Sequence, residues 1–110
     1  MLNADQVQNF IEGRTVYGFD PVTRAPAAVI TYHADGTCTA RFADGGRDTG
    51  VYGFEGDAYW TRYAQFRGGG TYAFRLEPIG QGVMQAWFTT GARAFVQADH
   101  PDPAPWPVPV

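Results

Sequence analysis

The chain has 110 residues, a length typical of one domain, and its 8 basic and 11 acidic residues give a formal net charge of −3. A general nucleic-acid surface normally carries a basic excess, so this balance argues against a nucleic-acid partner. Cys38 is the only cysteine and the chain has no serine, which excludes an intrachain disulfide and a serine nucleophile.

Residues 1–10 contain neither Lys nor Arg and no long apolar run, which predicts no signal peptide, no membrane-spanning helix and a cytoplasmic protein. Residues 3–12 form a helix candidate, with Asn3 or Asp5 at the N-terminal cap and Gly13 at a left-handed C-terminal cap. Its apolar residues share one face: Val7, Phe10 and Ile11. A helix this short is marginal alone and needs a surface to pack on.

Residues 14–98 repeat one pattern, a short run of β-forming residues followed by a turn with glycine or proline. The pattern predicts strands at residues 14–19, 27–33, 37–43, 49–54, 58–66, 71–77, 83–89 and 93–98. Short strands without helices between them predict an antiparallel meander, and closing it removes exposed edges. We therefore expect an all-β domain over residues 1–98, an eight-stranded barrel with the helix covering one mouth.

Residues 99–110 form a tail with five prolines in alternate positions, from Pro101 to Pro109. Such a run cannot pair in a sheet and favours an extended polyproline II conformation. A solvated tail is the simplest interpretation. The alternative is a strap in which Trp106 and Val108 dock on a groove of this subunit or a neighbouring one, because a lone tryptophan is unusual in a disordered tail.

The fifth strand leaves its inward face undecided. One register turns Trp60 and Arg62 inward, and the other turns Tyr59 and Tyr63 inward. An inward Arg62 would need an anion, because an unpaired buried charge is costly. That anion could come from a glutamate of the chain or from a ligand carboxylate or phosphate, which arginine binds through two hydrogen bonds.

Three segments carry a family resemblance: residues 10–18 (FIEGRTVYG), 32–37 (YHADGT) and 48–57 (DTGVYGFEGD), the last followed by Tyr59-Trp60. Together they resemble small bacterial lipocalin-like families of the calycin class, over roughly residues 10–96. The resemblance implies a short helix followed by a meandering barrel that holds small apolar or aromatic molecules. It transfers no catalytic residue. Secreted relatives have a signal peptide and paired cysteines, so a periplasmic role does not carry over.

The chain has two histidines, His33 and His100, and neither has cysteine or carboxylate neighbours at metal-ligand spacing, so we expect no metal and no cofactor. His33 stands near Asp35 and could act as a general base oriented by that carboxylate. The favoured interpretation is that Asp35 makes the turn with Gly36 while His33 faces solvent.

The leading hypothesis is that the barrel binds a small apolar or aromatic ligand, anionic ligands included, with no nucleic-acid or membrane partner. The expected lining consists of Trp60, Arg62, Tyr63, Tyr72, Gln85 and Trp87. The first alternative is a metal-independent lyase, isomerase or cyclase in the same pocket, using His33, Arg62 and Tyr63. The second is a homodimeric interaction module that uses an outer aromatic face and the proline tail. A barrel filled by its own side chains is a further outcome to test.

Overall fold

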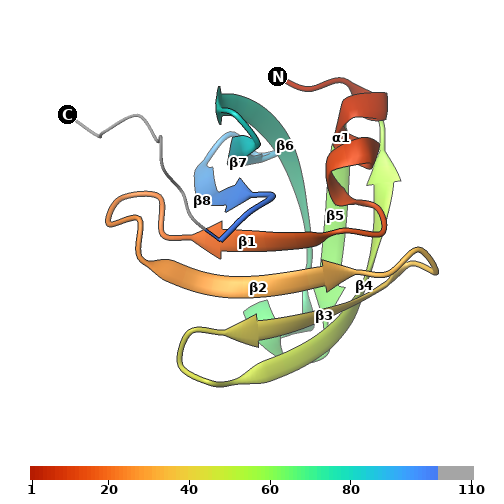
Figure 1. The fold of residues 1–110 in the computed structure, drawn as a ribbon. Coiled ribbons are helices and arrows are strands. Elements are labelled where there is room, and N and C mark those ends of the chain that lie inside the picture. The colour runs from red at the N-terminus through yellow and green to blue at the C-terminus, as the bar shows by residue number, and fades with distance from the viewer. Residues whose placement is uncertain (102–110) are drawn as a thin grey trace.

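The computed structural model describes residues 1–101 and arranges eight antiparallel strands in one closed barrel (Figure 1). The strands are β1 (Thr15–Phe19), β2 (Pro26–Tyr32), β3 (Thr37–Phe42), β4 (Arg47–Glu55), β5 (Ala58–Tyr63), β6 (Thr71–Gly80), β7 (Val83–Phe88) and β8 (Arg93–Ala98). Each strand pairs with the next along the chain, and β1 pairs with β8 to close the ring. The predicted all-β meander is confirmed, and its closure removes the edges that an open sheet would expose.

Seven strands differ from their predicted bounds, and the C-terminal ends of β5 and β6 differ most, by three residues each. β5 ends at Tyr63 because the chain then leaves the sheet and enters a 3-10 turn, η1 (Phe66–Gly69). β6 continues through Pro78, where the register shifts before Gly80, as expected for a residue that lacks an N–H for the ladder. The predicted strap around Trp106 lies outside the described residues.

The helix α1 (Ala4–Ile11) packs against β4 and β5 at one end of the barrel (Figure 1). Asn3 caps it in a capping box with Gln6, and Gly13 follows its end with a φ of 69°. The predicted apolar face is buried and joins the barrel core: Val7, Phe10 and Ile11. The helix therefore covers one mouth of the barrel, which leaves the opposite end for a cavity.

The register of β4 and β5 decides the inward face of β5. Gly53 pairs with Trp60, and a Cβ on Gly53 would lie only 2.7 Å from the indole ring. The indole therefore covers a glycine on the outer surface, an arrangement in which an aromatic ring shields backbone that has no side chain. Tyr59 and Tyr63 consequently point inward and are buried, and Arg62 is exposed.

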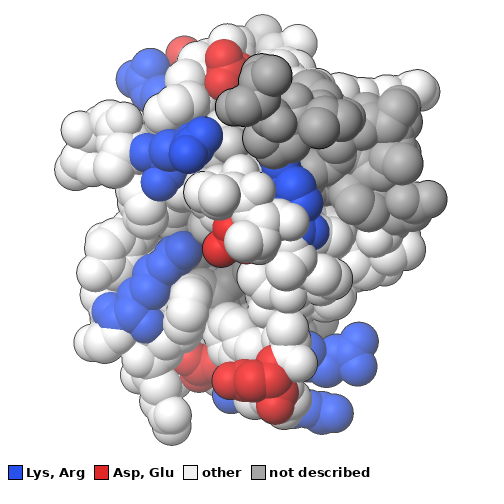
Figure 2. Space-filling model, turned by 90° about the vertical axis from the view of Figure 1, so that its left-hand side faces the viewer, with Lys and Arg blue, Asp and Glu red and all other residues white. Residues whose placement is uncertain are grey.

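Surface charge is spread out on the face that Figure 2 displays. Its arginines form several separate groups with uncharged and acidic surface between them. Nucleic-acid binding normally uses a continuous basic stripe, so this face supports the expectation of no nucleic-acid partner, which stays a prediction. Within residues 1–101, no helix is both long enough and apolar enough to cross a membrane.

Candidate functional site

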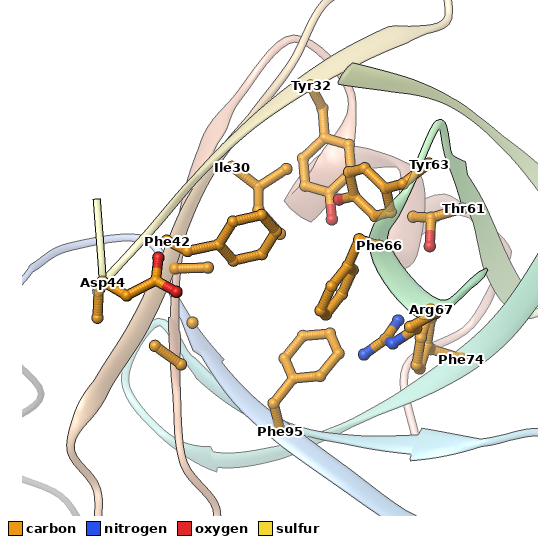
Figure 3. A pocket seen from close by; sticks show the side chains of 14 residues that line it. Ile30, Tyr32, Phe42, Asp44, Thr61, Tyr63, Phe66, Arg67, Phe74 and Phe95 are labelled. Carbon is orange, nitrogen blue, oxygen red and sulfur yellow. The ribbon is translucent and has the colours of Figure 1, made fainter. Parts of the chain in front are cut away.

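The barrel holds a cavity of about 530 Å³ at the end away from α1 (Figure 3). Its apolar wall is formed mainly by Ile30, Phe42, Phe66, Phe74 and Phe95. The exposed residues Ala27, Ala43 and Asp44 stand at its rim. Small-molecule sites commonly enclose about 300–1,000 Å³, so the barrel is hollow enough to hold a ligand rather than filled by its own side chains.

Arg67 reaches into this cavity from η1 (Figure 3). Its guanidinium carbon lies 4.8 Å from the ring centre of Phe66, 5.1 Å from that of Phe74 and 5.4 Å from that of Phe95. Burial lowers the pKa of the guanidinium. Within residues 1–101 its side chain makes no ion pair and no hydrogen bond to the protein. The aromatic rings attract the cation but accept none of its N–H groups in an ordinary hydrogen bond.

A cluster of buried polar groups lies deeper in the barrel. The Tyr59 hydroxyl donates to Gln97 Oε1 at 2.9 Å. The hydroxyls of Tyr32 and Tyr63 and the Nε2 of Gln97 are buried without a hydrogen-bond partner, and these residues are 1%, 4% and 0% exposed. Burial raises the pKa of Tyr32, Tyr59 and Tyr63, so the hydroxyls remain protonated at neutral pH. Of these groups, Tyr32 and Tyr63 line the cavity.

The turn that presents Arg67 is held by a carboxylate on a different strand. Asp48 Oδ2, on β4, accepts hydrogen bonds from the backbone N–H of Phe66 at 2.7 Å and of Gln65 at 3.0 Å. These bonds lower the pKa of Asp48 by favouring its charged form. Arg67 itself has a φ of 57°, in the left-handed region that a side chain seldom adopts. Asp48 therefore fixes the start of a strained turn at the cavity wall.

The cavity includes Tyr63 from the predicted lining but not Trp60 or Arg62. Both lie on the outer side of β5 because the register places the odd-numbered residues of that strand inside. Tyr72 is 39% exposed, and its ring centre is 5.5 Å from the guanidinium carbon of Arg67. It thus neighbours the cavity's cation without lining the cavity.

The two predicted lining residues of β7 also lie elsewhere. Gln85 is buried, but its amide nitrogen donates to backbone carbonyls across the barrel wall, those of Ala86, Ala94 and Phe95. Trp87 donates through its indole N–H to Glu77 Oε1 at 3.1 Å. A register shift between Gln85 and Trp87 breaks the simple alternation on which the prediction depended. Gln85 therefore braces the wall, and Trp87 belongs to the surface of β6 and β7.

The alternative catalytic set of His33, Arg62 and Tyr63 borders a shallow outer groove over β3, β4 and β5. The Tyr63 hydroxyl is buried and faces the cavity instead, near Tyr32 (Figure 3). Asp35 accepts from the N–H and hydroxyl of Thr37 at 2.9 and 2.7 Å, so its hydrogen bonds form the turn rather than orient His33. The structure thus does not bring the three reactive groups together. Among residues 1–101, no three histidine, cysteine or acidic side chains gather as metal ligands.

Sequence reasoning missed Arg67 as a site residue. It stands in a stretch read as a glycine-rich turn, Arg67-Gly68-Gly69-Gly70, where no alternation of faces indicates direction. One usable signal was the pair of large side chains, Phe66 and Arg67, directly before three glycines. Comparison with protein-family models, curated proteins and solved structures finds no match to this chain. The site is therefore interpreted from its own geometry.

Proposed function

We propose that the protein binds a small, largely apolar or aromatic molecule inside the barrel cavity. The observation that carries this proposal is a cavity of about 530 Å³ whose wall is aromatic but which also holds a guanidinium, that of Arg67, without an ion-pair or hydrogen-bond partner in residues 1–101. Apolar walls supply affinity, and a few placed polar groups supply orientation. The resemblance to lipocalin-like barrels supports the same function.

Binding is favoured over catalysis by the protonation states of the interior. A lyase or isomerase needs a group that accepts a proton near neutral pH. The interior titratable groups are Tyr32, Tyr63 and Arg67, and all three are protonated there. Asp44 is the carboxylate of the cavity lining, but it lies at the exposed rim and accepts from the N–H of Gly46 at 2.8 Å. The enzyme and the homodimer remain alternatives that this geometry does not favour.

A cavity-filling substitution tests the proposal. Ala28 lines the cavity, so Ala28→Phe should place a ring inside it. The matched change is Ala64→Phe, at an exposed residue directly after β5 that does not line the cavity. We expect calorimetric titration with 2-naphthol to show saturable binding at one site in the natural protein. Ala28→Phe should weaken it at least about tenfold, whereas Ala64→Phe should leave it within about twofold.

Circular dichroism and thermal unfolding of both variants control for misfolding. Native mass spectrometry of the purified protein, beside a denatured sample, adds an independent reading of any retained molecule and of the subunit number. Absence of saturable 2-naphthol binding together with a bare mass would contradict the proposal. Equal weakening by the two phenylalanine variants would also count against it, because it would place binding outside the cavity.

A further inference from the structure

The polar side chains of the cavity lining are the guanidinium of Arg67, the hydroxyls of Thr61, Tyr32 and Tyr63, and the carboxylate of Asp44. Arg67 offers guanidinium N–H groups and no acceptor. Tyr32 and Tyr63 carry buried hydroxyls without partners, and burial keeps both protonated. The lining carboxylate, Asp44, stands at the rim rather than inside. Hydroxyls can donate or accept a hydrogen bond, so Arg67 is the group in this interior that requires an acceptor from the ligand.

Arg67 favours a ligand acceptor that carries a negative charge. Its guanidinium is partly desolvated among the rings of Phe66, Phe74 and Phe95, and no carboxylate of the described chain pairs with it. Desolvating a cation is costly, and rings offset only part of that cost. An anionic oxygen would supply the missing charge and accept the N–H groups directly, in the paired geometry that guanidinium and carboxylate favour.

The backbone supports this role for Arg67. A left-handed φ of 57° at a non-glycine residue is strained, and such residues persist where the surrounding structure holds them, often at ligand sites. Here Asp48 holds the two preceding N–H groups. The turn thus keeps the guanidinium directed into the cavity instead of allowing it to turn to solvent.

The phenylalanine rings define the rest of the site. Rings of Phe42, Phe66 and Phe95 line the space beside the guanidinium (Figure 3). The hydroxyl oxygens of Tyr32 and Tyr63 are buried behind this wall. A ligand that pairs with Arg67 therefore needs a flat apolar body.

We propose that the cavity selects aromatic carboxylates, with Arg67 pairing with the carboxylate and the phenylalanine rings holding the aromatic system. This inference rests on the proposed function, because it requires that the cavity bind a small molecule. It adds the chemical class of that molecule and names the residue that discriminates by charge.

A matched pair of probes tests the charge selection. The probes are 2-naphthoate and 2-naphthamide, which share a shape and differ in charge, titrated by calorimetry at neutral pH. We expect the natural protein to bind the carboxylate at least about tenfold more tightly than the amide. Arg67→Gln should abolish that preference while leaving amide affinity within about threefold. Arg62→Gln, which removes an exposed arginine from the outer face, should leave the preference intact.

The outcomes distinguish carboxylate selection from the more general proposal that the cavity binds a small molecule. Equal affinity of the natural protein for the two probes, or a preference that survives Arg67→Gln, overturns the carboxylate selection and leaves cavity binding standing. Failure of both probes and of 2-naphthol to bind overturns both proposals. A thermal melt of Arg67→Gln and Arg62→Gln shows that each variant is folded.

Discussion

Tyr63 carries a polar atom that costs the ligand-free protein free energy. Its hydroxyl is buried without a hydrogen-bond partner, whereas the hydroxyl of Tyr59 donates to Gln97. Leaving a buried polar group unpaired costs about 1–3 kcal/mol, and a satisfied bond contributes about 1 kcal/mol. We therefore expect Tyr63→Phe to raise the free energy of unfolding by up to about 1–2 kcal/mol and Tyr59→Phe to lower it by about 1 kcal/mol, measured by urea unfolding.

The two variants make a matched comparison, because each removes one tyrosine hydroxyl from β5 while the expected changes in stability have opposite signs. A loss of stability in Tyr63→Phe comparable to that in Tyr59→Phe would mean that the Tyr63 hydroxyl is already satisfied in the free protein.

Residue-level prediction from sequence succeeded where the signal is local and failed where it is not. Tyr63 was named, and the structure places it in the cavity wall. Arg62 was named and Arg67 was not, because strand alternation was applied to the face that carries Trp60. What decides the face is a contact across strands, the indole of Trp60 lying over Gly53. The inward direction of Arg67 depends on a left-handed turn, which alternation does not describe.

At the scale of elements, η1 is positioned by β4 rather than by its own sequence. The carboxylate of Asp48 on β4 accepts hydrogen bonds from the backbone N–H groups of Gln65 and Phe66, which directly precede Arg67. We expect Asp48→Ala to loosen η1, accelerate hydrogen exchange at those two amides and weaken 2-naphthoate binding about three- to tenfold. Asp48→Asn, which keeps an acceptor oxygen, should show smaller effects.

Asp35 provides the control for that substitution. It holds its own turn through Thr37, at the β2–β3 connection, and bonds nothing in η1. Asp35→Ala should therefore leave exchange at residues 65 and 66 and the affinity for 2-naphthoate unchanged. If Asp48→Ala also leaves the two amides protected, the turn is held by something other than this carboxylate, and Asp48 has no positioning role.

At the scale of the whole molecule, the barrel was predictable because its determinants repeat along the chain. Each turn carries its own signal, as where Asp35 binds the N–H of Thr37 and Gly36 has a φ of 91°. The cavity was not predictable in the same way. Its polar groups come from β2, β5 and η1, and only closure of the ring brings them together. A hollow interior also depends on summed side-chain volumes, which local patterns do not reveal.

The interior tyrosines make the whole molecule sensitive to high pH. Burial raises the pKa of Tyr32, Tyr59 and Tyr63 above the value of about 10 expected in the unfolded chain. The unfolded state then releases protons that the folded state retains, so this stabilisation is complete below pH ~10 and is lost as the pH rises beyond it. Each tyrosine contributes a slope of about 1.4 kcal/mol per pH unit, so the three together approach 4 kcal/mol per unit.

The composition of the chain allows the tyrosine contribution to stability at high pH to be measured without interference from lysine. The chain contains no lysine, whose pKa of about 10.4 would otherwise fall in the same range. We expect unfolding followed by circular dichroism above pH ~10 to coincide with the rise of tyrosinate absorbance from the buried rings. Burial also raises the pKa of Tyr52, so four tyrosines share the slope and Tyr63→Phe should reduce it by about one quarter. The buried Cys38 has a raised pKa and adds in the same direction, so Cys38→Ala measures its share. Tyrosinate absorbance that reaches completion while the fold persists would contradict a buried, protonated set of interior tyrosines.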